Sequence, residues 1–317
     1  MAALTETCGS YGTGFEIFLT NSNNNDQPAN FAGGATPFQI LNEDIQYTDV
    51  VLGGNGLNGS VDSSINQVRN GARVVYGDIL LEVGPKELAS WMPYILGGSV
   101  MSKIFDPVFF DLLIKRDRGS AIYRRCAVNR AVIRSRATVD GDEQVMQLLI
   151  SVVGHEEHSG GEAPESQFND KPYWLHGDGI LSIAGRNEKD GQIYFDAFNL
   201  MVNNNLAPQT RNHLKVTCIR SMKRSVRLQC SVPLTESSFS NFVFGEEKRI
   251  SGTLSFLGSK NLNGTEYEGY KTVFSFPNLY QTRRTPSTRG HGEIPLSLDF
   301  QAFRDGEEAP MSVSISS

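Results

Sequence analysis

Several features that mark particular protein classes are scarce in this sequence of 317 residues. It has only four cysteines and no CxxC spacing, so neither a disulfide scaffold nor a zinc site of paired cysteines is expected. We interpret the cysteines as reduced thiols. The first ten residues lack the basic and apolar regions of a secretory signal, and no apolar run reaches the roughly 18 to 20 residues of a membrane span. The sequence therefore predicts a soluble protein made in a cytoplasm.

Positive charge is also scarce. The chain has 29 Lys and Arg against 35 Asp and Glu, a net charge of -6. Proteins that grip nucleic acid need clustered cations to displace the counterions of the phosphates, so this balance argues against a nucleic-acid reader. Short cation clusters such as Lys115 to Arg118 lie near acids, and we expect salt bridges within or between subunits. The composition, 39% hydrophobic and 20% charged, is that of a globular protein.

The usual signatures of nucleophilic and phosphoryl chemistry, GxSxG and GxxxxGK[ST], do not occur. Gly54, Gly56 and Gly59 match the GxGxxG motif of dinucleotide-binding proteins, and Asp78 follows about twenty residues further on. That chemistry needs a helix directly after the third glycine, whereas residues 60–68 are typical of a strand and a hairpin. We interpret the glycines as a turn, and a nucleotide-dependent enzyme stays an alternative.

The histidines do not form a recognisable catalytic set. His155 and His158, in the sequence HEEH, could bind a metal, but they fall in a polar segment that predicts a solvated loop. His176, His213 and His291 have no acid at a recognisable spacing and are expected at the surface or satisfied in the core. We therefore expect no catalytic residue, no cofactor and no metal.

Most patterned segments alternate with period two, which predicts half-buried antiparallel strands at Met146–Val152, Val226–Val232 and Ile294–Ala302. Asn70-Gly71 is the preferred dipeptide of a type I′ turn, so a hairpin is expected between Ile65–Arg69 and Ala72–Glu82.

Two short helices are expected. Pro85 can open the first, because its missing N–H would be unpaired anyway, and Gly97 can end it in the left-handed conformation. Apolar residues between them recur at helical spacing, although Pro93 must make the helix short or kinked. A second helix is expected from Pro233 to Gly245.

These helices reveal an internal repeat. Pro85 and Gly97 precede Pro233 and Gly245 by the same 148 residues, and at that offset Met146–Val152 falls on Ile294–Phe300. We infer two copies of one unit made of two strands, a helix and two strands. The polar segment His155–Pro172 reads as the linker, which gives domains 1–160, with an Asn-rich loop at Asn21–Pro37, and 161–317. Alternation at Met311, Val313 and Ile315 predicts a last strand that pairs with another subunit.

The stretch Leu57–Leu96 combines a glycine-rich lead, a hairpin, a strand and a proline-opened helix ending in Leu-Gly-Gly. In this order it resembles the first half of the phage tail tube proteins that carry two tube domains. Gly292–Phe303 resembles the closing strands of their second domain, and Leu181–Asn205 keeps the expected order between. The Asn-rich segment before Ile40 departs from the pattern.

The resemblance implies a mainly β fold: two tandem antiparallel β-sandwich or barrel domains, each with one short helix. It implies subunits joined edge to edge into rings that stack into the tail tube, the channel for genome DNA, in the virion of a long-tailed phage. The residues supply a reason, since ring closure removes exposed strand edges. Tube proteins of this type with one domain per chain close as hexamers, so the resemblance implies that a chain with two domains forms rings of three chains with pseudo-sixfold symmetry. Easy sliding of DNA predicts more acids than cations on the channel wall.

Other tail components, namely the terminator, baseplate, sheath and tape-measure proteins, are the partners that the resemblance implies. The turn at Asn70-Gly71 and its counterpart at Ser221–Arg224 are expected to reach the neighbouring ring. The candidate inter-ring contacts are Gln67, Arg69, Asn70, Gly71, Arg73, Ser221, Met222, Lys223 and Arg224.

Two further alternatives remain open at this point. The chain could be another ring-forming component of a tail, baseplate or contractile injection machine. It could also be a glycan-binding β-sandwich that exposes Trp91 or Trp174, although Trp91 lies on the apolar stripe of the expected helix, which favours core packing.

Overall fold

The structure is a computed structural model of the chain. It describes residues 16–22, 31, 35–52, 69–98, 101, 105–116, 119–137, 144–160, 173–183, 193–211, 213–234, 249–258, 270–283 and 295–316.

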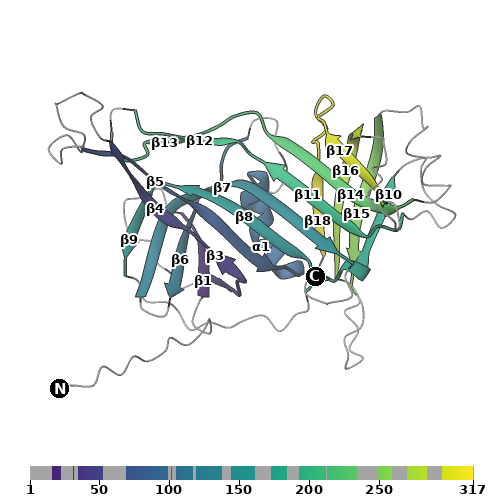
Figure 1. The fold of residues 1–317 in the computed structure, drawn as a ribbon, viewed down its shortest axis with the longest axis horizontal. Coiled ribbons are helices and arrows are strands. Elements are labelled where there is room, and N and C mark those ends of the chain that lie inside the picture. Colours follow the sequence, from purple (N-terminus) through teal and green to yellow (C-terminus); the bar gives the residue numbers. More distant parts are fainter. Residues whose placement is uncertain are drawn as a thin grey trace, which may run out of the picture.

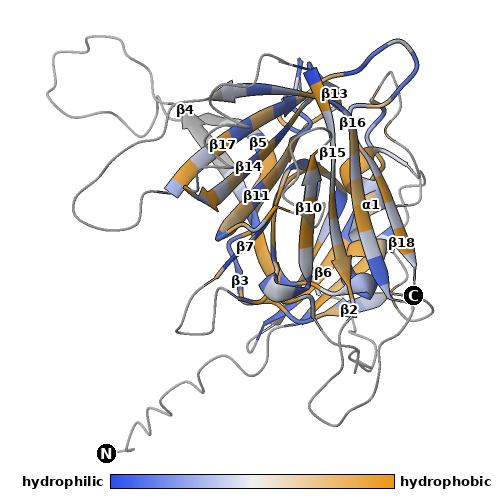
Figure 2. Cartoon of the chain, turned by 90° about the vertical axis from the view of Figure 1, so that its right-hand side faces the viewer, coloured by the Kyte–Doolittle hydropathy of each residue, from blue (hydrophilic) through white to orange (hydrophobic). Residues whose placement is uncertain are grey.

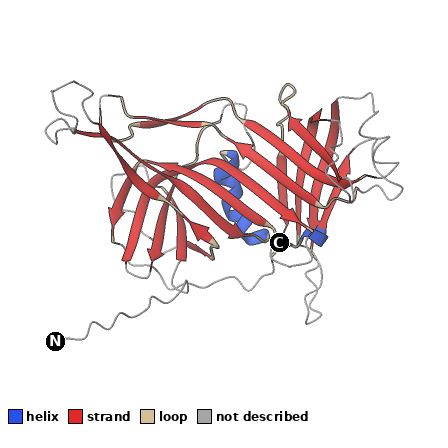
Figure 3. Cartoon of the chain, in the orientation of Figure 1, coloured by secondary structure: helices blue, strands red, loops and turns tan. Residues whose placement is uncertain are grey.

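The fold is mainly antiparallel β, with one α-helix and one 3-10 turn (η2, His176–Asp178) in the part of the chain that is described (Figure 3). Sixteen strands form one continuous sheet, and β12 and β13 form a separate pair. The first nine strands are β1 (Glu16–Asn21), β2 (Thr36–Phe38), β3 (Asn42–Glu43), β4 (Gln46–Leu52), β5 (Arg69–Glu82), β6 (Phe110–Arg116), β7 (Gly119–Arg136), β8 (Gln147–Gly154) and β9 (Glu156–Ser159). The others are β10 (Gly179–Ile183), β11 (Ala197–Asn203), β12 (Leu206–Gln209), β13 (Cys218–Ser221), β14 (Ser225–Pro233), β15 (Arg249–Leu257), β16 (Lys271–Arg283), β17 (Pro295–Ala302) and β18 (Ser312–Ser316).

The predicted first helix is confirmed as α1 (Pro85–Leu96). Pro85 occupies the first turn, and the Gly84 N–H donates to Glu87 Oε2 at 2.9 Å. Gly97 ends the helix with a φ of 81°, and its N–H donates to the Pro93 carbonyl at 3.0 Å. A residue with a Cβ would be strained in this left-handed conformation. The expected second helix, Pro233–Gly245, lies almost wholly outside the described residues.

The predicted strands are confirmed where the structure describes them. Alternate residues of β8, β14 and β17 are buried, so each strand has one face in the core. Figure 2 shows the resulting alternation of apolar and polar residues along the strands. The main apolar cluster includes α1 and residues from β1 through β17, and Trp91 and Trp174 are buried in it.

The order of paired strands occurs twice in the sheet. The first strand set runs β4, β5, β8, β7, β6, β1, and the second runs β11, β14, β17, β16, β15, β10. Corresponding strands also follow one another in the same chain order within β5 to β8 and β14 to β17. β7 and β11 pair and so join the two sets into one sheet, in which the strands follow one another along the long axis of the molecule (Figure 1).

The two strand sets also agree in register. β8 and β17 have the same length and start at residues 147 and 295, an offset of 148. The bulge in β7 between Val128 and Arg130 faces Val152 and Ser151. The bulge in β16 between Gln281 and Arg283 faces Phe300 and Asp299, the counterparts of those two residues at the same offset. A bulge in the same place fixes the correspondence residue by residue.

Two turn predictions were wrong. Asn70 and Gly71 lie inside β5, where Asn70 pairs with Val51 of β4, so the connection between these strands is residues 53–68 and not the Asn-Gly dipeptide. Ser221–Arg224 does not close a hairpin either, because β13 pairs with β12 while β14 pairs with β11 and β17. At Asn70-Gly71 the local dipeptide preference is overridden by pairing along the longer strand β5.

The predicted last strand is confirmed as β18, which pairs with β16 of its own chain, and its pairing with another subunit stays a prediction. One further expectation needs correction. The predicted linker starts too early, because β9 (Glu156–Ser159) pairs with β7 and His155 is buried. The remainder of that linker, residues 161–172, lies outside the described part of the chain.

Candidate assembly surfaces

The junction between the two strand sets is fixed by asparagines. β11 lies along β7 from Ala197 opposite Arg136 to Asn203 opposite Arg130. Asn204, which is fully buried, then donates through Nδ2 to the carbonyls of Ile95 at 3.0 Å and Val128 at 2.9 Å. These bonds tie the end of β11 to α1 and to the bulge of β7.

Beyond the junction the chain forms an arm, defined as residues 204–211 and 213–224, which contains β12 and β13. It returns over the first strand set, where its far end reaches β5 (Figure 1): the Arg73 N–H donates to the Leu214 carbonyl at 2.7 Å. Lys215 forms a 2.9 Å salt bridge with Glu156 of β9. The apolar residues of the arm and of the surface beneath it make a cluster of their own, formed by Phe105, Ala127, Val153, Leu206, Val216 and Ile219.

His155 lies under the arm and not in a solvated loop. Its Nδ1 is 3.0 Å from the Val216 carbonyl, so Nδ1 must carry the proton and donate it. Nε2 is buried and has no hydrogen-bond partner among the described residues. Burial, followed by the positive charge of Arg125, lowers the pKa of His155. The other histidine of the HEEH sequence, His158, is exposed and contacts Glu156 at 3.2 Å.

The predicted inter-ring contacts fall into two groups that the structure does not bring together. Arg69, Asn70, Gly71 and Arg73 belong to β5, and Gln67 lies outside the described residues. Of the second group, Met222 and Lys223 are exposed at the base of the arm.

Two residues of the second group make contacts within the chain instead. Ser221 Oγ donates to the Phe105 carbonyl at 2.9 Å, and Arg224 Nη1 donates to the Leu96 carbonyl at 2.9 Å. The Arg224 guanidinium also lies 4.9 Å from the Phe105 ring centroid. Burial, and then the charge of Arg304, lowers the pKa of Arg224 to about 10. Ser221 and Arg224 therefore hold the arm to its own chain.

The side of the sheet that faces away from the core is largely polar across both strand sets. One row of cross-strand neighbours is Glu82, Gln147, Arg134, Asn199, Gln229 and Asp299. Arg134 donates to Gln147 Oε1 at 3.1 and 3.2 Å, and a shallow depression lies beside them. The neighbouring row is apolar at one end, with Leu80, Leu149, Val132 and Met201 before Arg227.

The charges on this outward face are mixed. Among the described residues of β5, β7, β8, β11, β14 and β17 that alternate with buried ones, the cations are Arg125, Arg130, Arg134, Arg136 and Arg227. The acids at such positions are Asp78, Glu82 and Asp299. The face therefore carries no excess of acids.

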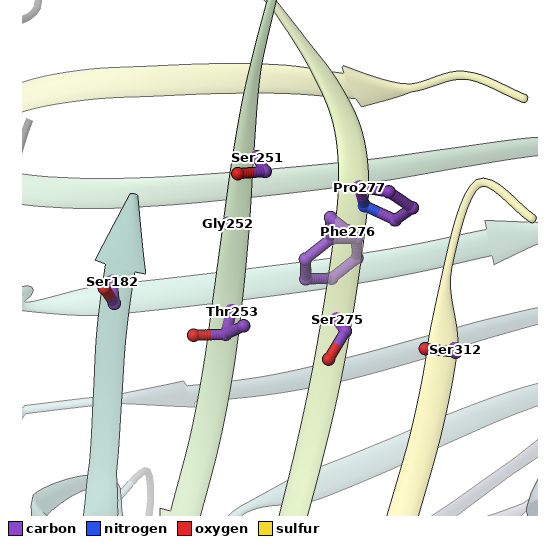
Figure 4. A pocket seen from close by; sticks show the side chains of 8 residues that line it. All are labelled: Ser182, Ser251, Gly252, Thr253, Ser275, Phe276, Pro277 and Ser312. Carbon is purple, nitrogen blue, oxygen red and sulfur yellow. The ribbon is translucent and has the colours of Figure 1, made fainter. Parts of the chain in front are cut away.

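A second outward face differs between the two strand sets. In the first set Phe18, Leu113 and Ile122 are cross-strand neighbours, and Phe31 covers them in a small apolar cluster. The corresponding neighbours in the second set all carry hydroxyl groups and line a shallow pocket of about 300 Å³ (Figure 4): Ser182, Thr253, Ser275 and Ser312. The hydroxyl groups of the second set can form hydrogen bonds with water. This surface therefore needs no apolar cover like the one that Phe31 provides in the first set.

The residues weighed for catalysis do not converge. His176 is buried, with Nδ1 2.9 Å from Ser135 Oγ and Nε2 2.9 Å from the Phe195 carbonyl, which confirms a satisfied core histidine. Cys126 and Cys230 are buried free thiols and Cys218 is a half-buried one. Gly54, Gly56 and Gly59 lie outside the described residues. No cluster of His, Cys, Asp and Glu suited to a metal occurs among the residues searched, which are the described ones.

No protein-family model and no curated protein matches the chain. Within the described part, none of the helices is long and apolar enough to cross a bilayer.

Sequence reasoning missed the arm and the asparagines that anchor it. The run Asn203-Asn204-Asn205 was visible, but polar residues at a strand end are typical of an ordinary turn. Burial of Asn204 depends on α1 and β7, which are distant in sequence.

Proposed function

We propose that this chain is a tail tube protein of a long-tailed bacteriophage, a structural virion protein that catalyses no reaction. In this proposal residues 1–160 and 161–317 are two tandem tube domains. Rings of the protein stack into the tube through which the genome leaves the capsid.

The observation that carries the proposal is the repeated strand order within one continuous sheet. The first strand set ends in β4, β16 of the second set extends past β15 at Gln281–Arg283, and β7 with β11 joins the sets between them. A sheet built from like sets, each joined to the next in the same way, can close on itself and leave no open edge. Six sets from three chains would then give strict threefold and approximate sixfold symmetry.

The outward face of the sheet suits a channel wall that DNA passes without being held. Asn, Gln and Ser side chains separate the arginines, and Arg134 is engaged by Gln147. Tight binding needs many simultaneous phosphate contacts, which dispersed cations do not offer. Our expectation of more acids than cations finds no support on this face, so weak retention would rest on dispersion of charge and not on repulsion.

Electron microscopy of the purified protein, alone and with tail initiation proteins, tests the proposal. Hollow tubes with three chains per ring are expected. A protein that stays monomeric under all these conditions would contradict it. Rings that never stack would favour the alternative, a ring-forming component of a baseplate or contractile injection machine.

The glycan-binding alternative loses its basis, because Trp91 and Trp174 are both buried. The nucleotide alternative is tested by thermal denaturation with NAD or ATP. A rise in the melting temperature with either compound would favour an enzyme using Gly54, Gly56 and Gly59.

A further inference from the structure

The second strand set exposes two aromatic rings at positions that are covered in the first. β7 and β8 pair Ala127 with Val153, and β16 and β17 pair Tyr280 with Gln301, the counterpart of Val153 at an offset of 148. At the same offset His155 corresponds to Phe303. Tyr280 and Phe303 therefore occupy the places of Ala127 and His155.

The exposures at these places differ sharply. Ala127 is 1% exposed and His155 6%, because the arm lies over them. Tyr280 is 39% exposed and Phe303 46%, and their rings contact each other edge to face with centroids 6.3 Å apart. Side chains that would be polar on a freely solvated surface are here aromatic, which is typical of a contact surface.

The strand that leads into the arm, β11, has a counterpart at the other end of the sheet, which is β4. β11, which leads into the arm, pairs with β14 on one side and with β7 on the other. Its counterpart β4 pairs with β5, and the structure gives it no second partner strand among the described residues. β4 and the Gln281–Arg283 end of β16 lie at opposite ends of the run β4, β5, β8, β7, β11, β14, β17, β16, so one chain cannot bring them together (Figure 1).

We infer that β4 of one chain pairs with the end of β16 of a second copy, and that this contact covers Tyr280 and Phe303 of that copy. The inference rests on the proposed function and specifies the surfaces that would close the ring. It repeats between chains the contact that β11 makes with β7 within a chain.

The corresponding registers predict which residues meet. Arg130 and Asn203 are opposite one another in the junction within the chain. The matching bulges make Arg283 the counterpart of Arg130. Asn203 pairs with Ser225, and Thr48 pairs with Val74 at the corresponding place of β5, so Thr48 is the counterpart of Asn203. Thr48 of one chain should therefore lie opposite Arg283 of the next.

Disulfide cross-linking tests this pairing. The Thr48→Cys and Arg283→Cys double variant, with Cys8 and Cys218 replaced by Ser, is oxidised under assembly conditions and analysed by non-reducing electrophoresis. We expect covalent dimers and trimers, and no larger species if three chains close the ring. The control joins Thr48→Cys to Lys271→Cys, at the far end of β16, and should stay monomeric. Assembly without cross-links between positions 48 and 283 would overturn the inference.

A second experiment tests the aromatic surface. The Tyr280→Ser and Phe303→Ser double variant should lose at least tenfold in the fraction of chains assembled while its monomer unfolds cooperatively like the unmodified chain. Tyr194→Ser, which changes a tyrosine that is 62% exposed elsewhere on the surface, is the control and should assemble normally. Normal assembly of the double variant would reject this surface but leave the tube proposal standing. Failure of the unmodified chain to form any ring would defeat both.

Discussion

Replacement of Asn204 by Ala removes the side chain that fastens the two strand sets to each other. Its amide donates to two carbonyls, those of Ile95 at the end of α1 and Val128 in β7, and the residue is fully buried. A net contribution of about 1 kcal/mol for each hydrogen bond, with an added cost for the carbonyls left buried without a donor, predicts a loss of about 3 kcal/mol.

Thermal denaturation of the unassembled protein, followed by far-UV circular dichroism, measures this loss. For a chain of this size the melting temperature should fall by roughly 6 °C. The matched control is Asn199→Ala on the same strand, because Asn199 is only half-buried and its amide makes one long contact of 3.4 Å with Gln229. That variant should lose less than about 1 kcal/mol.

Equal melting temperatures for the two variants would refute the reasoning. The junction would then be held by the backbone pairing of β7 with β11, and the buried amide of Asn204 would contribute nothing that water does not supply in the variant. A large loss for Asn204→Ala accompanied by normal unfolding of Asn199→Ala would support the assignment.

Three further predictions concern the surroundings of the junction. His155 has a lowered pKa in the folded state, so its neutral form stabilises the fold above the ordinary pKa of about 6.5, and stability should fall as pH drops below that value. His155→Gln should remove this part of the pH dependence of the melting temperature. An unchanged loss of melting temperature in acid would contradict this prediction. Gly97→Ala combines a φ of 81° with a Cβ 2.6 Å from the Phe105 ring, so it should lose about 3 kcal/mol, whereas Gly306→Ala, with a φ of 57° and open space, should lose about 1 kcal/mol in urea denaturation. Phe31→Ala should lose about 3 kcal/mol by opening the small apolar cluster, and a loss below about 1 kcal/mol would show that this cover is dispensable.

Patterns in the sequence determined those helices and strands whose formation depends on residues close together in the chain. Period-two alternation predicts β8, β14 and β17 because one face of each strand must enter the core. Pro85 and Gly97 predict the ends of α1 because backbone conformation at those two positions depends on the residue itself. The internal offset of 148 residues was visible for the same reason, since two copies of a strand bury the same pattern of side chains.

Only the tertiary structure decided which strands are neighbours. Alternation indicates which face of a strand is buried, but pairing partners depend on contacts between residues far apart in sequence. Asn70 and Gly71 could form a turn by themselves, yet β4 continues past them as a partner and keeps them extended. β18 could pair with another chain, but an edge of β16 lies within reach in its own. The arm is held by Asn204, Arg224 and His155, whose partners are backbone carbonyls. Every residue has a backbone carbonyl, so the sequence alone does not show which of them accepts such a hydrogen bond.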